Sequence, residues 1–522
     1  MDLKQQQIHR TYKKCEAKNQ ITLGNDYSVP EGKPDVAKIL QKRAELSVDE
    51  VHAEKGKVKI KGILKVWVFY LAQRSSRTAD SFLVEIPFDE MLYMEGACSG
   101  DHLKVDWLIE ELKIGIIHPG KLDIRCVLQL CATVTGSEIY EITEDVEKED
   151  CIHRKIKKYM AAEAALDKKD SYRIRDEVSL LPGSPNVERM LWYSLQLRGL
   201  DIRLQEDRMA IKGECQFFTI YEGEEDSSKL QWFEQSIPFT GMLDVNGLKA
   251  GMFGSLETEI SHQSVELKPD YDGELRSFQI EMMLDIHMNL YEEQTISVLL
   301  DAYSTKEQVD LQKKEIICEK LRMCNETKCR VNEKQKVESE SKILQILGNC
   351  AELTNKRYRV QEEGILCEGM LNVQILYVSA NDLDSMGSMS VEIPYGQLVE
   401  IPGIQKEDNW KVVECIDQIY VAMQDSETVD VKGVMNFQVC VLEPLMIDNV
   451  TAAESSAYDQ EIYKGRPGMT IHFVKPNETL WELAKAYWTT TEAICELNEL
   501  PQNEVSPGQK LLLLKDPLEP AL

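Results

Sequence analysis

The sequence has no long apolar segment and no excess of positive charge, and both absences restrict what the protein does. No uninterrupted apolar run reaches the roughly 20 residues that a membrane-spanning helix needs. The opening residues, Met1–Gln7, contain no apolar core of the kind that a secretory signal requires. We therefore expect a cytoplasmic protein without a transmembrane segment. The formal net charge of −29 repels phosphate backbones and anionic bilayers, so nucleic-acid binding is not expected.

Motifs that carry chemistry are also missing. The sequence contains no glycine-rich phosphate loop, no serine-elbow pentapeptide and no His-Glu-x-x-His, and its eight histidines are scattered. Its 14 cysteines form no compact framework, which in a reducing cytosol predicts free thiols. Cys318, Cys324 and Cys329 form the one cluster, with spacings that differ from the paired knuckles of zinc sites. We expect no metal, no cofactor and no catalytic residues, and hence no enzyme.

A three-fold repeat is the strongest internal pattern of the sequence. In three places a glycine stands eight residues before a tyrosine, and the tyrosine stands seventeen residues before the proline of an Ile-Pro-aromatic triplet. The glycines are Gly62, Gly213 and Gly369, the tyrosines are Tyr70, Tyr221 and Tyr377, and the prolines are Pro87, Pro238 and Pro394. Because both intervals agree, we interpret the three segments as copies of one unit, offset by 151 and 156 residues.

Each copy is expected to be rich in β-structure. The stretch from glycine to tyrosine is rich in β-branched and aromatic residues, and polar spans such as 380–384 indicate a hairpin-like return. A proline inside the next strand indicates an edge strand or a bulge. The glycines are interpreted as points of close backbone approach, and the tyrosines as residues packed against the sheet. Upstream of each glycine, apolar residues with helical spacing predict a short helix: Val36, Ile39 and Leu40; Val187, Met190 and Leu191; Ile343, Ile346 and Leu347.

Charged segments with a helical pattern separate the copies and predict linkers. The expected limits are 20–140, 171–303 and 340–446 for the β-rich units, and 141–170, 304–339 and 447–466 for the linkers. A terminal domain is expected at 467–517. The predicted fold class is multidomain, mainly β with α (α+β): three tandem β-rich repeat units followed by a βααβ domain. Tandem units on linkers are typical of a spacer or scaffold rather than of an enzyme with one cleft.

The segment Met469–Lys515 carries the βααβ pattern. Thr479 and Glu482 have the spacing of a capping box at the start of a first helix, and Thr489 and Glu492 repeat that spacing before a second. Asn498 suits the left-handed conformation that often ends a helix. A strand on each side of this helix pair completes the predicted domain.

This segment resembles a LysM domain. The matching positions are Val474, Thr479, Leu480, Trp481, Ala484, Tyr487, Asn498 and Pro507–Leu511. The resemblance implies a shallow groove for N-acetylglucosamine glycans between two loops. The family's Gly-Asp appears here as Asn477-Glu478, and the longer Glu478 side chain would intrude on a sugar ring. Trp488 stands where the family has a small residue, so it is either a surface aromatic for protein contact or a buried residue that anchors a loop. The candidate contacts with a protein or a glycan are Asn477, Glu478, Thr479, Leu480, Trp481, Trp488, Asn498 and Leu500.

The whole chain resembles the SipL-type morphogenetic proteins of the clostridial spore coat, which carry repeated sporulation domains before one LysM domain. The resemblance implies a non-enzymatic adaptor in the mother-cell cytoplasm, at the forespore surface. It also implies that the LysM domain binds the coat-basement ATPase SpoIVA, with other coat proteins or self-association as further contacts. The alternative is a peptidoglycan-binding protein. An enzyme hidden in the repeats would need polar residues clustered in one copy only, which the sequence does not show.

Overall fold

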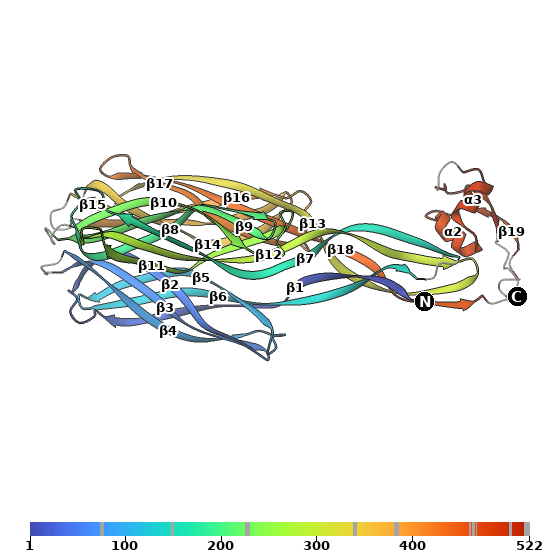
Figure 1. The fold of residues 1–522 in the computed structure, drawn as a ribbon, viewed down its shortest axis with the longest axis horizontal. Coiled ribbons are helices and arrows are strands. Elements are labelled where there is room, and N and C mark those ends of the chain that lie inside the picture. Colours follow the sequence, from blue (N-terminus) through green and yellow to red (C-terminus); the bar gives the residue numbers. More distant parts are fainter. Residues whose placement is uncertain are drawn as a thin grey trace.

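The computed structural model describes residues 1–73, 78–147, 151–224, 230–337, 342–380, 386–458, 461, 465, 467–500 and 504–515. Most of the hairpin-like return expected at 380–384 lies outside these residues. The described residues form three β-sandwich bodies at one end, a narrow stalk of long strands, and a small helical domain at the far end of the stalk (Figure 1).

The first body is a sandwich of two three-stranded antiparallel sheets. One sheet has the order β2-β3-β4, from the strands Val36–Glu54, Lys57–Ala72 and Ala79–Tyr93. The other has the order β1-β6-β5, from Leu3–Ser28, Lys121–Val146 and His102–His118. Side chains alternate between the two faces of a strand, so every second residue of β3 and β6 is buried between the sheets, as Leu64, Val66, Leu128 and Leu130 are.

The second and third bodies repeat this topology. In the second, the sheets are β10-β9-β8 and β11-β12-β7, formed by β7 (Ile152–Ser179), β8 (Val187–Gln205), β9 (Arg208–Gly223), β10 (Leu230–Asp244), β11 (Phe253–Pro269) and β12 (Leu275–Ser304). In the third they are β14-β15-β16 and β13-β18-β17, formed by β13 (Glu307–Lys336), β14 (Ile343–Gln361), β15 (Gly364–Ser379), β16 (Met386–Glu400), β17 (Asn409–Met423) and β18 (Thr428–Ala457). The described repeats are thus built from strands, and the α+β label overstates their helix content.

The repeated glycine lies directly opposite the repeated aromatic residue on the neighbouring strand. The cross-strand pairs are Gly62 with Phe88, Gly213 with Phe239, and Gly369 with Tyr395. A Cβ atom at Gly62 would lie 2.2 Å from the Ser47 carbonyl oxygen and 2.9 Å from the Phe88 ring. The glycine therefore permits the close backbone approach that the sequence predicts.

The repeated proline and tyrosine also lie where the sequence places them. The three prolines are on β4, β10 and β16, which are edge strands, so their missing N–H groups cost no hydrogen bond in the middle of a sheet. The tyrosines are buried. The Tyr70 hydroxyl donates to the Pro34 carbonyl oxygen at 2.8 Å, and the Tyr221 hydroxyl donates to that of Pro185 at 3.4 Å. These hydrogen bonds connect the tyrosine on the middle strand of the sheet to the residues just before the first strand of that sheet.

The short helices predicted at the start of each copy are wrong. These residues begin the strands β2, β8 and β14. Two register shifts interrupt the pairing at equivalent places in each copy, for example between Val36 and Lys38 and between Ile39 and Gln41. Each bulge adds a residue and changes the face to which the next side chains point. As a result Val36 enters the sandwich core while Leu40 points to the opposite side, which gives apolar spacings like those of a helix.

The helical interpretation of the segments 141–170 and 304–339 is wrong as well. Their described residues form the end of β6 and much of β7, and most of β13. Charged residues lie on the exposed faces of these strands, and partners distant in sequence supply the hydrogen bonds. The pairs β1–β6, β7–β12 and β13–β18 run beyond the sandwiches as three ribbons (Figure 1). Apolar residues from all three ribbons pack together there: Ile8, Ile142, Ala161, Ile296, Val298, Ile316, Cys318 and Ile447.

The bodies also meet around a shared core of three-fold character. Leu40, Leu191 and Leu347 pack there, and the repeat offsets relate them to one another. The same offsets relate a second set, Phe69, Ile220 and Leu376. Nearby, the buried Asp80 of the first body accepts from Lys33 at 2.7 Å and from Arg189 of the second body at 3.0 Å. The repeats therefore form one assembly with interior contacts between the bodies.

Candidate functional site

The terminal domain consists of β19 (Met469–Phe473), α2 (Leu480–Tyr487), α3 (Thr491–Leu497) and β20 (Lys510–Leu514). Thr479 caps α2 through the predicted capping box, because its hydroxyl accepts from Glu482 N and the Glu482 carboxylate accepts from Thr479 N. The cap of α3 is Thr490 rather than the predicted Thr489, since the Thr490 hydroxyl accepts from Ala493 N at 3.0 Å. Both helices pack on one face of the β19–β20 ladder and form a small core of their own.

The first predicted contact loop is well ordered by its own side chains. Asn477 is exposed and has a φ of 65°, a left-handed conformation that asparagine tolerates better than most residues. Glu478 bends back onto β19, where one carboxylate oxygen lies 2.7 Å from His472 Nε2 and accepts from Lys475 N at 2.9 Å. Burial raises the pKa of Glu478, but these hydrogen bonds outweigh it and leave the pKa below its ordinary value. In this conformation the carboxylate is held by His472 and Lys475, and the intrusion of Glu478 on a sugar ring stays a prediction.

Three of the other predicted contacts hold the domain together. Leu480 is buried in its core, and Leu500 packs against that core. Asn498 bridges α3 and β20, because its side chain accepts from Leu512 N at 2.6 Å and donates to the carbonyl oxygens of Leu512 and Ile494. Asn498 does not adopt the predicted left-handed conformation; its φ is −104°, and Glu499 follows at 53°. These side-chain hydrogen bonds hold Asn498 in place, and the left-handed conformation occurs one residue later, at Glu499.

Trp481 faces the stalk. Its indole Nε1 donates to Asp301 Oδ2 at 2.8 Å, and Lys485, one helical turn further on, pairs with Asp301 Oδ1 at 2.7 Å. The Trp481 ring also meets the Tyr303 ring edge-on, with centroids 4.8 Å apart. Burial raises the pKa of Asp301, but the hydrogen bonds from Lys485 and Trp481 outweigh it and leave the pKa below its ordinary value. The predicted partner-binding tryptophan thus docks the domain on the end of β12.

Trp488 takes part in the same junction. It is only 9% exposed and has a φ of 51°, which matches the buried, loop-anchoring alternative. Its ring meets that of Tyr458 edge-on at 5.2 Å, and the Tyr303 hydroxyl donates to the neighbouring Thr489 carbonyl oxygen at 2.9 Å. The sequence analysis did not single out Asp301, Tyr303 or Tyr458, because nothing in their local patterns indicates a contact with residues so far away along the chain.

The outer face of the β19–β20 ladder is the most apolar exposed surface of the domain. Met469, Ile471 and Phe473 point away from the helices and are 60%, 55% and 62% exposed. Opposite Met469 on β20, Leu514 is 39% exposed. Exposed apolar clusters of this kind are typical of protein contact sites. None of the contacts predicted from the sequence lies on this face.

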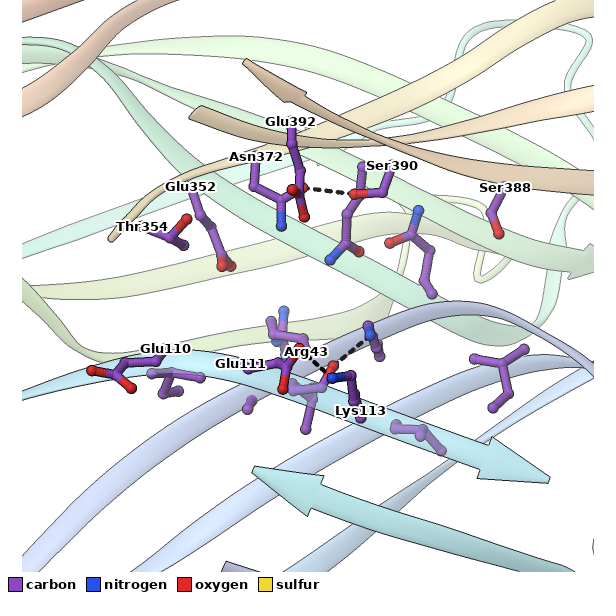
Figure 2. Close-up of a pocket in the computed structure, with 18 of the residues that line it drawn as sticks. Arg43, Glu110, Glu111, Lys113, Glu352, Thr354, Asn372, Ser388, Ser390 and Glu392 are labelled. Atoms are coloured by element: carbon purple, nitrogen blue, oxygen red, sulfur yellow. Dashed lines mark hydrogen bonds and ion pairs between the residues drawn. The ribbon is translucent and has the colours of Figure 1, made fainter. Parts of the chain in front are cut away.

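Away from the terminal domain, a hollow of about 670 Å³ lies between the first and third bodies. Figure 2 shows Arg43 and Glu111 on one side and Glu352 and Asn372 on the other. The Arg43 guanidinium lies over the Trp67 ring at 4.5 Å, and burial raises the pKa of Glu352. The lining of this hollow is mostly polar and contains none of the residues predicted to contact a protein or a glycan.

Metal ligands do not converge in the part of the chain that the structure describes: no group of three or more His, Cys, Asp or Glu residues is placed to hold an ion. The cysteines of the sequence cluster lie along one strand, β13, and are separated: Cys318 is in the stalk, Cys329 is in the third sandwich, and Cys324 faces Cys440. Neither α2 nor α3 has the length and hydropathy of a membrane-spanning helix.

The fold and the terminal domain define a tandem-repeat β-sandwich protein that carries a LysM-like module at the end of a stalk. Comparison with protein families agrees with this description. The SipL, SPOCS domain model matches residues 35–117, 186–268 and 342–424, and the LysM domain model matches residues 472–513. The chain is a SipL-type sporulation protein, as its sequence indicates. No curated protein and no solved structure matches it.

Proposed function

We propose that this protein is a non-enzymatic adaptor of spore-coat assembly. In this proposal it acts in the mother-cell cytoplasm at the forespore surface, and its LysM domain captures a SpoIVA-like coat ATPase. The sandwich bodies and the stalk position the domain, and self-association or contacts with other coat proteins involve the bodies.

The observation that carries this proposal is the exposed apolar face of β19 and β20. A protein partner that covers Met469, Ile471 and Phe473 removes these side chains from water, whereas a sugar offers little apolar surface to them. The face lies on the sheet side opposite the helices, so docking through Trp481 leaves it open. The predicted loop residues Asn477, Glu478 and Thr479 lie between β19 and α2, and we include them in the proposed contact surface.

Capture of a purified SpoIVA-like ATPase by the immobilised full chain tests this function. We expect removal of Met469–Leu522 to abolish capture while the repeats stay folded. The double substitution I471S/F473S should reduce capture at least tenfold, because it removes two exposed apolar contacts without touching the core. Tyr271→Ser is the matched control, since Tyr271 is an exposed aromatic residue of the second body. Full capture by the truncated chain would contradict the proposal.

The second candidate function is binding of peptidoglycan through its N-acetylglucosamine glycans. The bent-back Glu478 favours it, because this carboxylate bonds to His472 and Lys475 instead of extending from the loop. Co-sedimentation of the full chain with purified peptidoglycan is the test. Sedimentation that survives I471S/F473S but is lost in the truncated chain would identify a glycan site separate from the apolar face.

A further inference from the structure

Two cysteines face each other between the edge strand and the central strand of one sheet of the third body. Cys324 on β13 and Cys440 on β18 are direct partners in the antiparallel register. The two thiols share a hydrogen bond, and their sulfur atoms are 2.6 Å apart. Directly opposed residues of antiparallel strands have Cα separations of about 4.5–5.5 Å, which lies within the range of protein disulfides. The backbone therefore already holds this pair in a geometry that a covalent bond allows.

The two thiols differ in access. Cys324 is exposed, and Cys440 is buried behind it. Both line a hollow of about 340 Å³ between β11 of the second body and the sheet of the third, together with Lys411, Gly254 and Ser255. A small polar molecule can enter this hollow and meet Cys324 first. Ser255 presents a buried hydroxyl without a hydrogen-bond partner among the described residues.

The surroundings favour the thiolate at Cys324. Its hydrogen bond with Cys440 lowers the pKa of Cys324 more than burial raises it, and a backbone hydrogen bond with Gly254 lowers it further. The pKa of Cys440 is raised by the same hydrogen bond and by burial. This asymmetry is that of an attacking thiolate beside a protonated resolving thiol.

We propose that Cys324 and Cys440 are a peroxide-sensitive pair that forms a disulfide between β13 and β18. The Cys324 thiolate attacks one oxygen of a hydroperoxide, the O–O bond breaks, and Cys324 becomes a sulfenic acid while the departing oxygen takes up a proton. Cys440 sulfur then attacks the sulfenic sulfur, the S–O bond breaks, and the Cys440 proton leaves with the hydroxyl as water. With hydrogen peroxide, two thiols are oxidised and one peroxide is reduced to two waters.

The disulfide would fix the third ribbon at the point where the second body abuts it. Cys324 follows a register shift between Leu321 and Met323, and the ladder is locally interrupted there. A covalent link beside this shift restrains sliding between β13 and β18. In the reduced pair no covalent bond links the two strands, so oxidation would stiffen this edge of the third body without changing its fold.

The test is peptide mapping of the full chain after treatment with dilute hydrogen peroxide, alkylation of the remaining thiols and digestion without reductant. We expect linked peptides that contain Cys324 and Cys440, and their release by dithiothreitol. In Cys440→Ser the sulfenic acid at Cys324 has no resolving thiol, so its dimedone adduct should increase at least tenfold over the wild type. In Cys324→Ser the link should be absent and Cys440 should stay alkylatable.

Cys98→Ser is the matched control, because Cys98 is also exposed but lies in the loop between β4 and β5, away from the β13–β18 pair; the Cys324–Cys440 link should persist in this variant. Circular dichroism of each variant confirms that the strands are retained. The proposal is overturned if wild-type Cys324 gives as much dimedone adduct as Cys440→Ser. It is also overturned if Cys324 pairs mainly with another cysteine, or if both thiols stay free while Cys98 is oxidised.

Discussion

Asp301 holds the LysM domain on the stalk, and its removal should release the domain. Its carboxylate accepts from Trp481 and pairs with Lys485, and its side chain is 17% exposed. A hydrogen bond to a charged acceptor contributes about 1.5–3 kcal/mol. The ion pair adds at most about 1 kcal/mol, because the Lys485 side chain is 40% exposed and solvent screens it. We expect Asp301→Ala to weaken docking by about 2–3 kcal/mol, roughly a hundredfold shift toward the undocked domain.

Hydrogen–deuterium exchange measures this release. Peptides that cover α2 and the end of β12 should exchange faster in Asp301→Ala, while peptides of the sandwich cores stay unchanged. Asp301→Asn keeps an acceptor for Trp481 and should give an intermediate effect. Asp310→Ala is the matched control, because Asp310 is an exposed aspartate near the same end of the stalk. Unchanged exchange at α2 and β12 in Asp301→Ala would refute the role of this carboxylate.

The sign of the pH dependence follows from the lowered pKa of Asp301. A carboxyl group whose pKa is lower in the docked state stabilises docking above its ordinary pKa of about 4. That contribution is lost as the pH falls toward and through the lowered value. Protection of α2, taken relative to the intrinsic exchange rate at each pH, should therefore decrease on acidification in the wild type, and this decrease should be smaller in Asp301→Asn.

Three further predictions concern the stability of the repeats, each measured by urea unfolding. Leu347→Ala should lower the free energy of unfolding by about 2–5 kcal/mol, because it leaves a cavity in the core shared by the bodies. Leu344 lies on the same strand but is 61% exposed, so Leu344→Ala should change the free energy little. Equal effects of the two variants would contradict a shared core. Asp80→Asn should lower the free energy of unfolding by about 2–3 kcal/mol, because Lys33 loses its buried carboxylate and Arg189 keeps only Glu222. Asp89→Asn at the surface should have a negligible effect. The contribution of Asp80 in the wild type should fade below about pH 4, since the pKa of Asp80 is lowered. Gly62→Ala should lower the free energy of unfolding by about 1–3 kcal/mol, because the added Cβ meets the Ser47 carbonyl and the Phe88 ring. Gly115→Ala is the control, since a Cβ there meets nothing within 4 Å. An unchanged stability of Gly62→Ala would show that the aromatic ring is not fixed.

Sequence reasoning identified the features that depend on local chemistry. The Gly–Tyr–Pro spacing is a pattern of neighbouring strands, so it correctly predicted a close backbone approach at Gly62 and, as one of two alternatives, edge strands at the prolines. The capping box at Thr479 and the order of elements in the LysM domain follow from short-range rules as well. The internal spacing already indicated three repeats before a βααβ domain, and the resemblance added the families to which these parts belong.

Features that depend on distant partners could not be obtained in this way. The bulges near Val36 produce helix-like spacing, and only the register with β3 reveals the strand. The charged segments of β7 and β13 look helical until their partners β12 and β18 are known. The contact between Asp301 and Trp481 joins residues 180 positions apart, and neither residue carries a local signal for the other.

The stalk has a mechanical consequence. Its strands run along the line from the sandwich bodies to the LysM domain (Figure 1), and the hydrogen bonds between antiparallel strands lie across that line. A pull on the LysM domain therefore loads many of these bonds in shear at the same time, instead of opening them one after another. The weakest element under tension is then the Asp301 junction, so the domain should swing free well before any ribbon yields.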